Sequence, residues 1–140
     1  MNPIIQEEVT GCGIASAAAL KQISYQEAKE VANNLGIYAD DSTLWSDTVY
    51  VRKLLASLGI STSDQETPFS TWETLPDKAL LAIKWHEENG KPFWHWVVFV
   101  RVQGKPYVLD SKKALKSNLR TDFGRMKPKW FIEVYDKAAR

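Results

Sequence analysis

The single cysteine of the chain lies in a segment suited to hold a reactive thiol. Cys12 stands between Gly11 and Gly13, and an alanine-rich run follows it. Glycines let the backbone approach a ligand closely, and the run is expected to start a helix with its N-terminus at the sulfur. The free N–H groups and partial positive charge of a helix N-terminus favour a thiolate over a thiol. The segment therefore predicts a nucleophile, although a lone cysteine is more often a small buried apolar residue.

One of the two histidines can be paired with an acid by strand geometry. His95 begins an apolar run over residues 95–102, and Asp110 ends the next run, over residues 107–110. If the two runs form a hairpin with a loop of even length, Asp110 shares a sheet face with His95. A carboxylate there holds one imidazole nitrogen and leaves the other free to exchange a proton with a thiol. These residues predict a triad of Cys12, His95 and Asp110.

Each of these residues also has a purely structural interpretation. A histidine at a strand end is most often a structural polar group, and an aspartate such as Asp110 commonly begins a turn. Gln6, six residues before the cysteine, is compatible with simple surface exposure. His86 is expected in a turn with no identifiable acidic partner, and we interpret it as structural.

The positioning elements indicate an α+β domain with helices in the first half and an antiparallel sheet in the second. Helices are expected over residues 13–21, 24–35 and 47–58, the second opened by a capping box and each of the last two stopped by a glycine. Strands are expected over residues 79–85, 95–102, 107–110 and 130–135, with turns at 87–92 and 103–106. The 95–102 run is apolar on both faces, which predicts a central strand covered on both sides.

Composition limits the class of protein. The 140 residues, 44% of them hydrophobic, are expected to form a single domain over residues 1–140. The 18 basic and 17 acidic residues are interspersed, so nucleic acid and anionic membranes are poor partners. No apolar run approaches the ~18 residues of a membrane span, and the N-terminus has neither region of a signal peptide. One cysteine forms no internal disulfide, so we expect a cytoplasmic protein.

The order of these residues resembles that of the papain-like cysteine peptidases, over nearly the whole chain. It is most similar to the bacteriocin-processing peptidases, which cleave double-glycine leaders. Gln6 precedes Cys12 by the family's interval, the segment His95–Val98 matches its histidine-aromatic-valine-valine strand, and Val108–Asp110 follows. The shorter matches lie at residues 35–37, 42–44, 58–59, 75–76 and 79–84.

The resemblance implies a papain-like fold, in which N-terminal helices pack on a C-terminal antiparallel sheet. It implies that Cys12 is the nucleophile, that His95 is the general base and acid, and that Asp110 orients the histidine. It further implies that Gln6 donates a side-chain N–H to the oxyanion hole, together with the backbone of Cys12.

The substrate is the least determined part of this interpretation. The family's leader-cleaving members commonly carry an aspartate before the cysteine and a proline after the triad aspartate, where this chain has Gly11 and Ser111. We expect a stand-alone cysteine peptidase that hydrolyses a peptide bond through a thioester. A cysteine peptidase of this kind implies no metal or organic cofactor. The resemblance implies a peptide or protein substrate, for which a Gly-Gly leader is the family's example, and a separately encoded transporter as a partner. Two alternatives stay open: an acyl transferase, isopeptidase or deamidase with the same triad, and a non-catalytic domain that binds a leader peptide.

Overall fold

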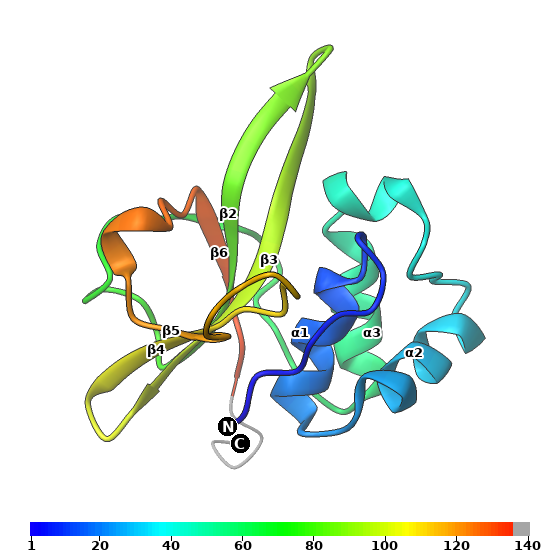
Figure 1. The fold of residues 1–140 in the computed structure, drawn as a ribbon, viewed down its shortest axis with the longest axis horizontal. Coiled ribbons are helices and arrows are strands. Elements are labelled where there is room, and N and C mark those ends of the chain that lie inside the picture. The colour runs from blue at the N-terminus through cyan, green and yellow to red at the C-terminus, as the bar shows by residue number, and fades with distance from the viewer. Residues whose placement is uncertain (136–140) are drawn as a thin grey trace.

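The chain, described over residues 1–135 by a computed structural model, places three helices on one side of an antiparallel sheet (Figure 1). The helices are α1 (Cys12–Lys21), α2 (Tyr25–Asn34) and α3 (Val49–Ser57), with short 3₁₀ helices η1 (Ser42–Ser46) and η2 (Phe123–Arg125). The strands are β1 (Thr67–Pro68), β2 (Lys78–Glu88), β3 (Lys91–Val102), β4 (Lys105–Leu109), β5 (Leu119–Arg120) and β6 (Trp130–Glu133). The predicted α+β class is confirmed.

The sheet has the strand order β1-β6-β2-β3-β4-β5, so that the chain's last strand returns to pair with β2. Both central hairpins turn through two residues. Asn89 and Gly90 join β2 to β3, and Gln103 and Gly104 join β3 to β4, all four with left-handed φ values between 52° and 79°. Two consecutive left-handed residues match the right-handed twist of the flanking strands. The resulting register places Val98 opposite Leu109.

The structure corrects several predicted boundaries. The turn expected at 87–92 is wrong, because only Asn89 and Gly90 turn and the strands continue on both sides. His86 therefore lies within β2 and not in a turn. The short strands β1 and β5 were not predicted, since two residues carry no readable alternation. The third helix begins at Val49, after the N-cap residue Thr48, and the Asp47 carboxylate accepts the Val49 N–H at 2.7 Å.

Two apolar clusters cover the two faces of the sheet. Toward the helices, Trp96, Val98 and Leu80 pack against α1, of which every residue from Cys12 to Ala19 is buried. On the opposite face, Val97 and Phe99 pack with other apolar side chains of the sheet and loops. The prediction of a central strand covered on both sides is confirmed for β3. The small alanine side chains of α1 let this helix approach β3 closely, which brings the helix N-terminus to the sheet.

The capping box expected at the start of the second helix is present at α2. The Ser24 hydroxyl accepts the Glu27 N–H at 3.1 Å, and the Glu27 carboxylate accepts the Ser24 N–H at 3.2 Å. None of the helices within residues 1–135 has both the length and the apolar content needed to cross a bilayer.

Candidate active site

The β3–β4 hairpin brings His95 and Asp110 together, as expected for a hairpin loop with an even number of residues. The two-residue turn makes Leu109 the partner of Val98, so Asp110 follows the strand on the same face as His95. The Nε2 atom of His95 lies 2.7 Å from an Asp110 carboxylate oxygen. The predicted contact between the two side chains is thereby confirmed, and Nδ1 is the ring nitrogen left for other chemistry.

The Asp110 carboxylate is fully buried and has partners at both oxygens. The oxygen that contacts His95 also accepts the Lys112 N–H at 3.1 Å, and the other oxygen accepts from the Arg120 guanidinium at 3.0 Å. Burial raises the pKa of Asp110, but the bonds from His95, the Lys112 backbone and Arg120 outweigh it and lower this pKa to about 2. The carboxylate therefore stays ionised at all physiological pH values.

Arg120 is a site residue that the sequence interpretation missed. It lies in β5, and its guanidinium also binds the Asp122 carboxylate at 2.6 and 2.9 Å. Because β5 has only two residues and Arg120 is ten residues from Asp110, no sequence pattern marked the contact. The arginine fixes the carboxylate from the side opposite His95.

Replacing Arg120 with methionine is expected to lower the free energy of unfolding by roughly 1–3 kcal/mol, because one buried oxygen of Asp110 loses its partner. Urea denaturation at pH 7 measures the effect. Asp122→Asn is the matched control, since it weakens a half-exposed contact of the same arginine and is expected to cost less than about 1 kcal/mol. Equal stability of Arg120→Met and the parent chain would contradict this assignment.

Cys12 is the first residue of α1, as the sequence predicts, and it is 2% exposed. Its sulfur accepts the backbone N–H of Trp96 at 3.4 Å. That N–H is available because β4 pairs with β3 only from Val98 onward, which leaves the β3 edge open beside the helix. The sulfur thus lies between a helix N-terminus and a backbone N–H at the sheet edge.

The charge state of His95 depends on its two neighbours. Burial lowers the pKa of His95, but the hydrogen bond with Asp110 and the interaction with the Cys12 sulfur raise it to about 9. The imidazole is therefore an imidazolium at neutral pH. Cys12, His95 and Asp110 thus come from three segments of the fold, namely α1, β3 and the end of β4.

The glycines that flank Cys12 have a different role from the expected one. A Cβ atom at Gly11 would collide with the Tyr25 hydroxyl, and one at Gly13 would collide with the Tyr50 hydroxyl. The groups that approach the glycine backbone are therefore the chain's own tyrosine hydroxyls. The presence of glycine at these two positions is explained without a ligand. Their absence of side chains lets α2 and α3 pack around the first turn of α1.

Gln6 is buried beside the site and links the N-terminal segment to the residue after Asp110. Its side-chain oxygen accepts from the Ser111 hydroxyl at 2.7 Å, and its backbone N–H donates to the Ser111 carbonyl at 3.0 Å. Its side-chain nitrogen donates to the carbonyls of Glu8 and Val9, each at 2.9 Å. Both amide hydrogens thus point at loop carbonyls, and one of them has to turn before it reaches an oxyanion.

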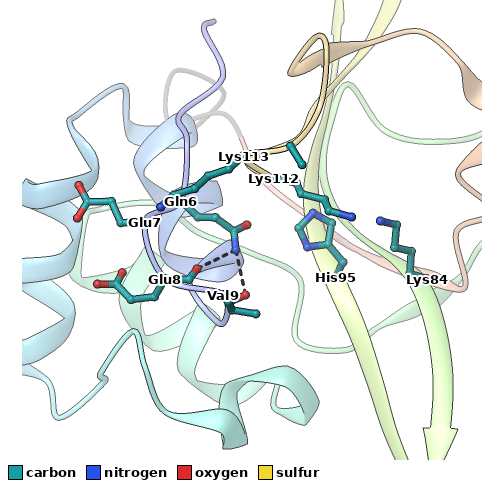
Figure 2. A pocket seen from close by; sticks show the side chains of 9 residues that line it. Gln6, Glu7, Glu8, Val9, Lys84, His95, Lys112 and Lys113 are labelled. Atoms are coloured by element: carbon teal, nitrogen blue, oxygen red, sulfur yellow. Dashed lines mark hydrogen bonds between the residues drawn. The ribbon is translucent and has the colours of Figure 1, made fainter.

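A cleft of about 340 Å³ opens next to these residues (Figure 2). Gln6 lies on one wall and His95 on the other. The remaining lining residues come from the N-terminal loop, from β2 and from the loop after Asp110: Glu7, Glu8, Val9, Lys84, Lys112, Lys113 and Ala114. The cleft thus lies between the imidazole and the N-terminal loop.

His86 lies apart from this arrangement. It is exposed on β2, stacks on Phe93 and pairs with Glu88, its Nε2 lying 2.9 Å from the carboxylate. The prediction that His86 lacks an acidic partner is wrong, because the longer β2 strand brings Glu88 to the same face. Hydrogen bonds that the imidazole makes to the Lys84 carbonyl and to the Glu88 carboxylate raise the pKa of His86 above its usual value.

Within residues 1–135, no three His, Cys, Asp or Glu side chains converge as a metal site would require. No protein-family model matches the sequence, and no curated protein matches it significantly. Function is therefore inferred from the geometry of Cys12, His95, Asp110 and Gln6.

Proposed function

We propose that this chain is a papain-like cysteine peptidase that hydrolyses peptide bonds through a thioester. The observation that carries the proposal is the 2.7 Å contact between His95 and Asp110. The Cys12 sulfur, at the N-terminus of α1, also interacts with this imidazole. The α+β layout, with helices on one side of an antiparallel sheet, is compatible with a papain-like fold. We place the protein in the cytoplasm, where thiols stay reduced.

In the first half-reaction, the Cys12 thiolate attacks the carbonyl carbon of the scissile bond, and the carbonyl oxygen becomes an oxyanion. The Cys12 backbone N–H, which has no acceptor within its own helix, and the Gln6 amide are the donors for that oxyanion. His95 Nδ1 gives its proton to the leaving amine as the C–N bond breaks. The acyl group stays on sulfur as a thioester.

In the second half-reaction, His95 takes a proton from water while the water oxygen attacks the thioester. The tetrahedral intermediate collapses, the carboxylic acid product leaves, and sulfur recovers the electron pair as a thiolate. Asp110 keeps Nε2 of His95 occupied through both steps and so fixes which nitrogen transfers the proton.

Cys12 is expected to react with iodoacetamide at pH 6 about 10–100 times faster than free cysteine, which is less than about 1% thiolate at that pH. The physical reason is that the helix N-terminus, the Trp96 N–H and the His95 imidazolium all stabilise the thiolate. Intact-mass measurement of the alkylated fraction over time gives the rate, and the chain offers a single site for the label.

The control for this rate is His95→Gln, which removes the imidazolium and is expected to slow alkylation about tenfold or more. Because Cys12 is 2% exposed, the experiment also tests whether the thiol is reachable. Alkylation of the parent chain no faster than that of free cysteine, or equal rates in the parent chain and His95→Gln, would argue against a catalytic thiol.

Substrate class is tested with peptides that contain Gly-Gly, since small residues before the scissile bond are the family's preference. Incubation with and without an added amine, followed by mass spectrometry, separates hydrolysis from acyl transfer. A covalent thioester on Cys12 supports both enzymatic functions. Peptide binding without a thioester or product would favour the non-catalytic alternative.

A further inference from the structure

Two lysines approach each other in the cleft beside the imidazole. Lys84 on β2 and Lys112 in the loop after Asp110 point their ammonium groups toward one another next to His95 (Figure 2). Lys113 lines the same cleft. None of these residues belongs to the proposed triad.

Lys84 is aimed at the cleft by an irregularity in the sheet. The register between β2 and β3 shifts between Ile83 and His86, and Lys84 adopts a left-handed φ of 56°. A residue with a Cβ pays a conformational cost in that region, and such positions cluster at functional sites. The bulge moves the Lys84 side chain out of the regular alternation of the strand.

Lys112 is held in place by the same carboxylate that orients His95. Its N–H donates to Asp110 at 3.1 Å, and its carbonyl accepts from the Asn118 amide at 2.8 Å. Both backbone groups are thus fixed, which leaves the side chain to project over the cleft. The position of this ammonium is coupled to the geometry of the triad.

Among the residues that the structure describes, the cleft lysines have no carboxylate partner of their own. Within residues 1–135, no ion pair reaches the ammonium groups of Lys84, Lys112 or Lys113. Of the acids nearby, Glu8 binds Lys29 at 2.6 Å, and both oxygens of Asp110 are occupied. Glu7, which also lines the cleft, accepts from the Gln26 amide at 2.8 and 2.9 Å.

Lys84 is the lysine most affected by this crowding. Burial and the neighbouring Lys112 lower its pKa, and the attraction of Asp110 offsets this only in part. Two cations that face each other without an anion gain from any carboxylate placed between them.

We propose that Lys84 and Lys112 form a carboxylate-binding subsite, so that the preferred peptide carries a carboxylate close to its scissile bond. The inference deepens the proposed peptidase function and rests on it. The carboxylate belongs either to an acidic side chain or to a free C-terminus, and both present the same pair of oxygens to two ammonium groups.

The test measures binding without turnover, by calorimetry with Cys12→Ala. The probes are acetylated, amidated hexapeptides with Gly-Gly at the centre and one aspartate at each other position in turn. The neutral reference has asparagine at all those positions, and a last peptide is the reference with a free C-terminal carboxylate. At least one acidic peptide is expected to bind about tenfold more tightly than the reference, because a charge-assisted hydrogen bond contributes about that factor.

That gain is expected to disappear when Lys84→Met or Lys112→Met is added, and to survive in Lys112→Arg. The matched control is Lys105→Met, at the exposed start of β4 and outside the cleft. If an aspartate peptide shows the gain in affinity, the subsite binds a side-chain carboxylate. If the peptide with the free C-terminus shows it, the subsite binds a terminal carboxylate. Equal binding of all peptides, or a gain that persists without both lysines, would overturn the inference.

The proposed function can fail separately from this subsite. Slow alkylation of Cys12 together with lysine-dependent binding would reject the peptidase and keep the subsite. Rapid, His95-dependent alkylation with no preference for acidic peptides would keep the peptidase and reject the subsite.

Discussion

Turnover of peptide substrates is expected to fall by at least about 10⁴-fold when His95 is replaced by alanine, and to remain near the parent value in His86→Ala. His95 is mostly buried, shares a hydrogen bond with Asp110 and interacts with the Cys12 sulfur. His86 is exposed, and its partner is Glu88 on the same strand. The rate of product formation from a peptide substrate, followed by mass spectrometry, gives the turnover of both variants.

The two histidine variants form a controlled pair because each removes an imidazole that contacts a carboxylate. Loss of folding is checked by circular dichroism, and Asp110 keeps Arg120 and the Lys112 N–H in His95→Ala. Full activity in His95→Ala with loss in His86→Ala would show that the hairpin argument assigns the wrong histidine.

The same assignment has a pH signature. His95 must be protonated to donate to the leaving amine, so kcat/KM is expected to decline as the pH rises, with an apparent pKa near 9, the value to which Asp110 and Cys12 raise the pKa of this imidazole.

Because the folded-state pKa of His95 lies above the unfolded value of about 6.5, its contribution to stability is complete below pH 6.5 and is lost as pH rises through 9. Asp110 acts in the opposite direction: its lowered pKa gives a contribution that is lost as pH falls from about 4 through 2.

The pairing of His95 with Asp110 could be predicted from sequence because it depends only on whether the hairpin loop has an even or an odd number of residues. Side chains alternate with period two, and the two-residue turn at Gln103 and Gly104 fixes the register without reference to the rest of the fold. The start of the first helix at Cys12 was also predictable, since glycine before an alanine-rich run is a local signal. Local signals of this kind give the class of fold and the order of its elements.

The contacts that tune the site could not be predicted, because they depend on where strands end and where they deviate. The Trp96 N–H reaches Cys12 only because β4 stops pairing at Val98. Arg120 reaches Asp110 from a strand of two residues, and Lys84 enters the cleft through a bulge. None of these features leaves a periodic pattern in the sequence. The predicted single domain covers residues 1–140, and its last five residues, 136–140, lie outside the described part of the chain.

Gln6 is the residue whose expected role the structure changes most. As an oxyanion donor alone, it would be dispensable for folding. Its side chain instead makes three hydrogen bonds, to Glu8, Val9 and Ser111, in a buried position. Its loss is therefore expected to cost roughly 1–3 kcal/mol of unfolding free energy as well as activity.

Gln6→Ala is expected to lower kcat about 100- to 1,000-fold and to change KM little, because the amide contributes to the transition state more than to substrate binding. Gln6→Glu is expected to recover no activity, since a carboxylate repels both the oxyanion and the carbonyls of Glu8 and Val9. Steady-state rates at a temperature well below both melting transitions measure these effects. The matched control is Thr10→Val, which removes the buried hydrogen bond from Thr10 to the Ala39 carbonyl in the same N-terminal region. This control variant is expected to lose stability and keep its kcat. If Gln6→Ala likewise loses only stability, Gln6 is a structural residue, and the proposed mechanism loses one oxyanion donor.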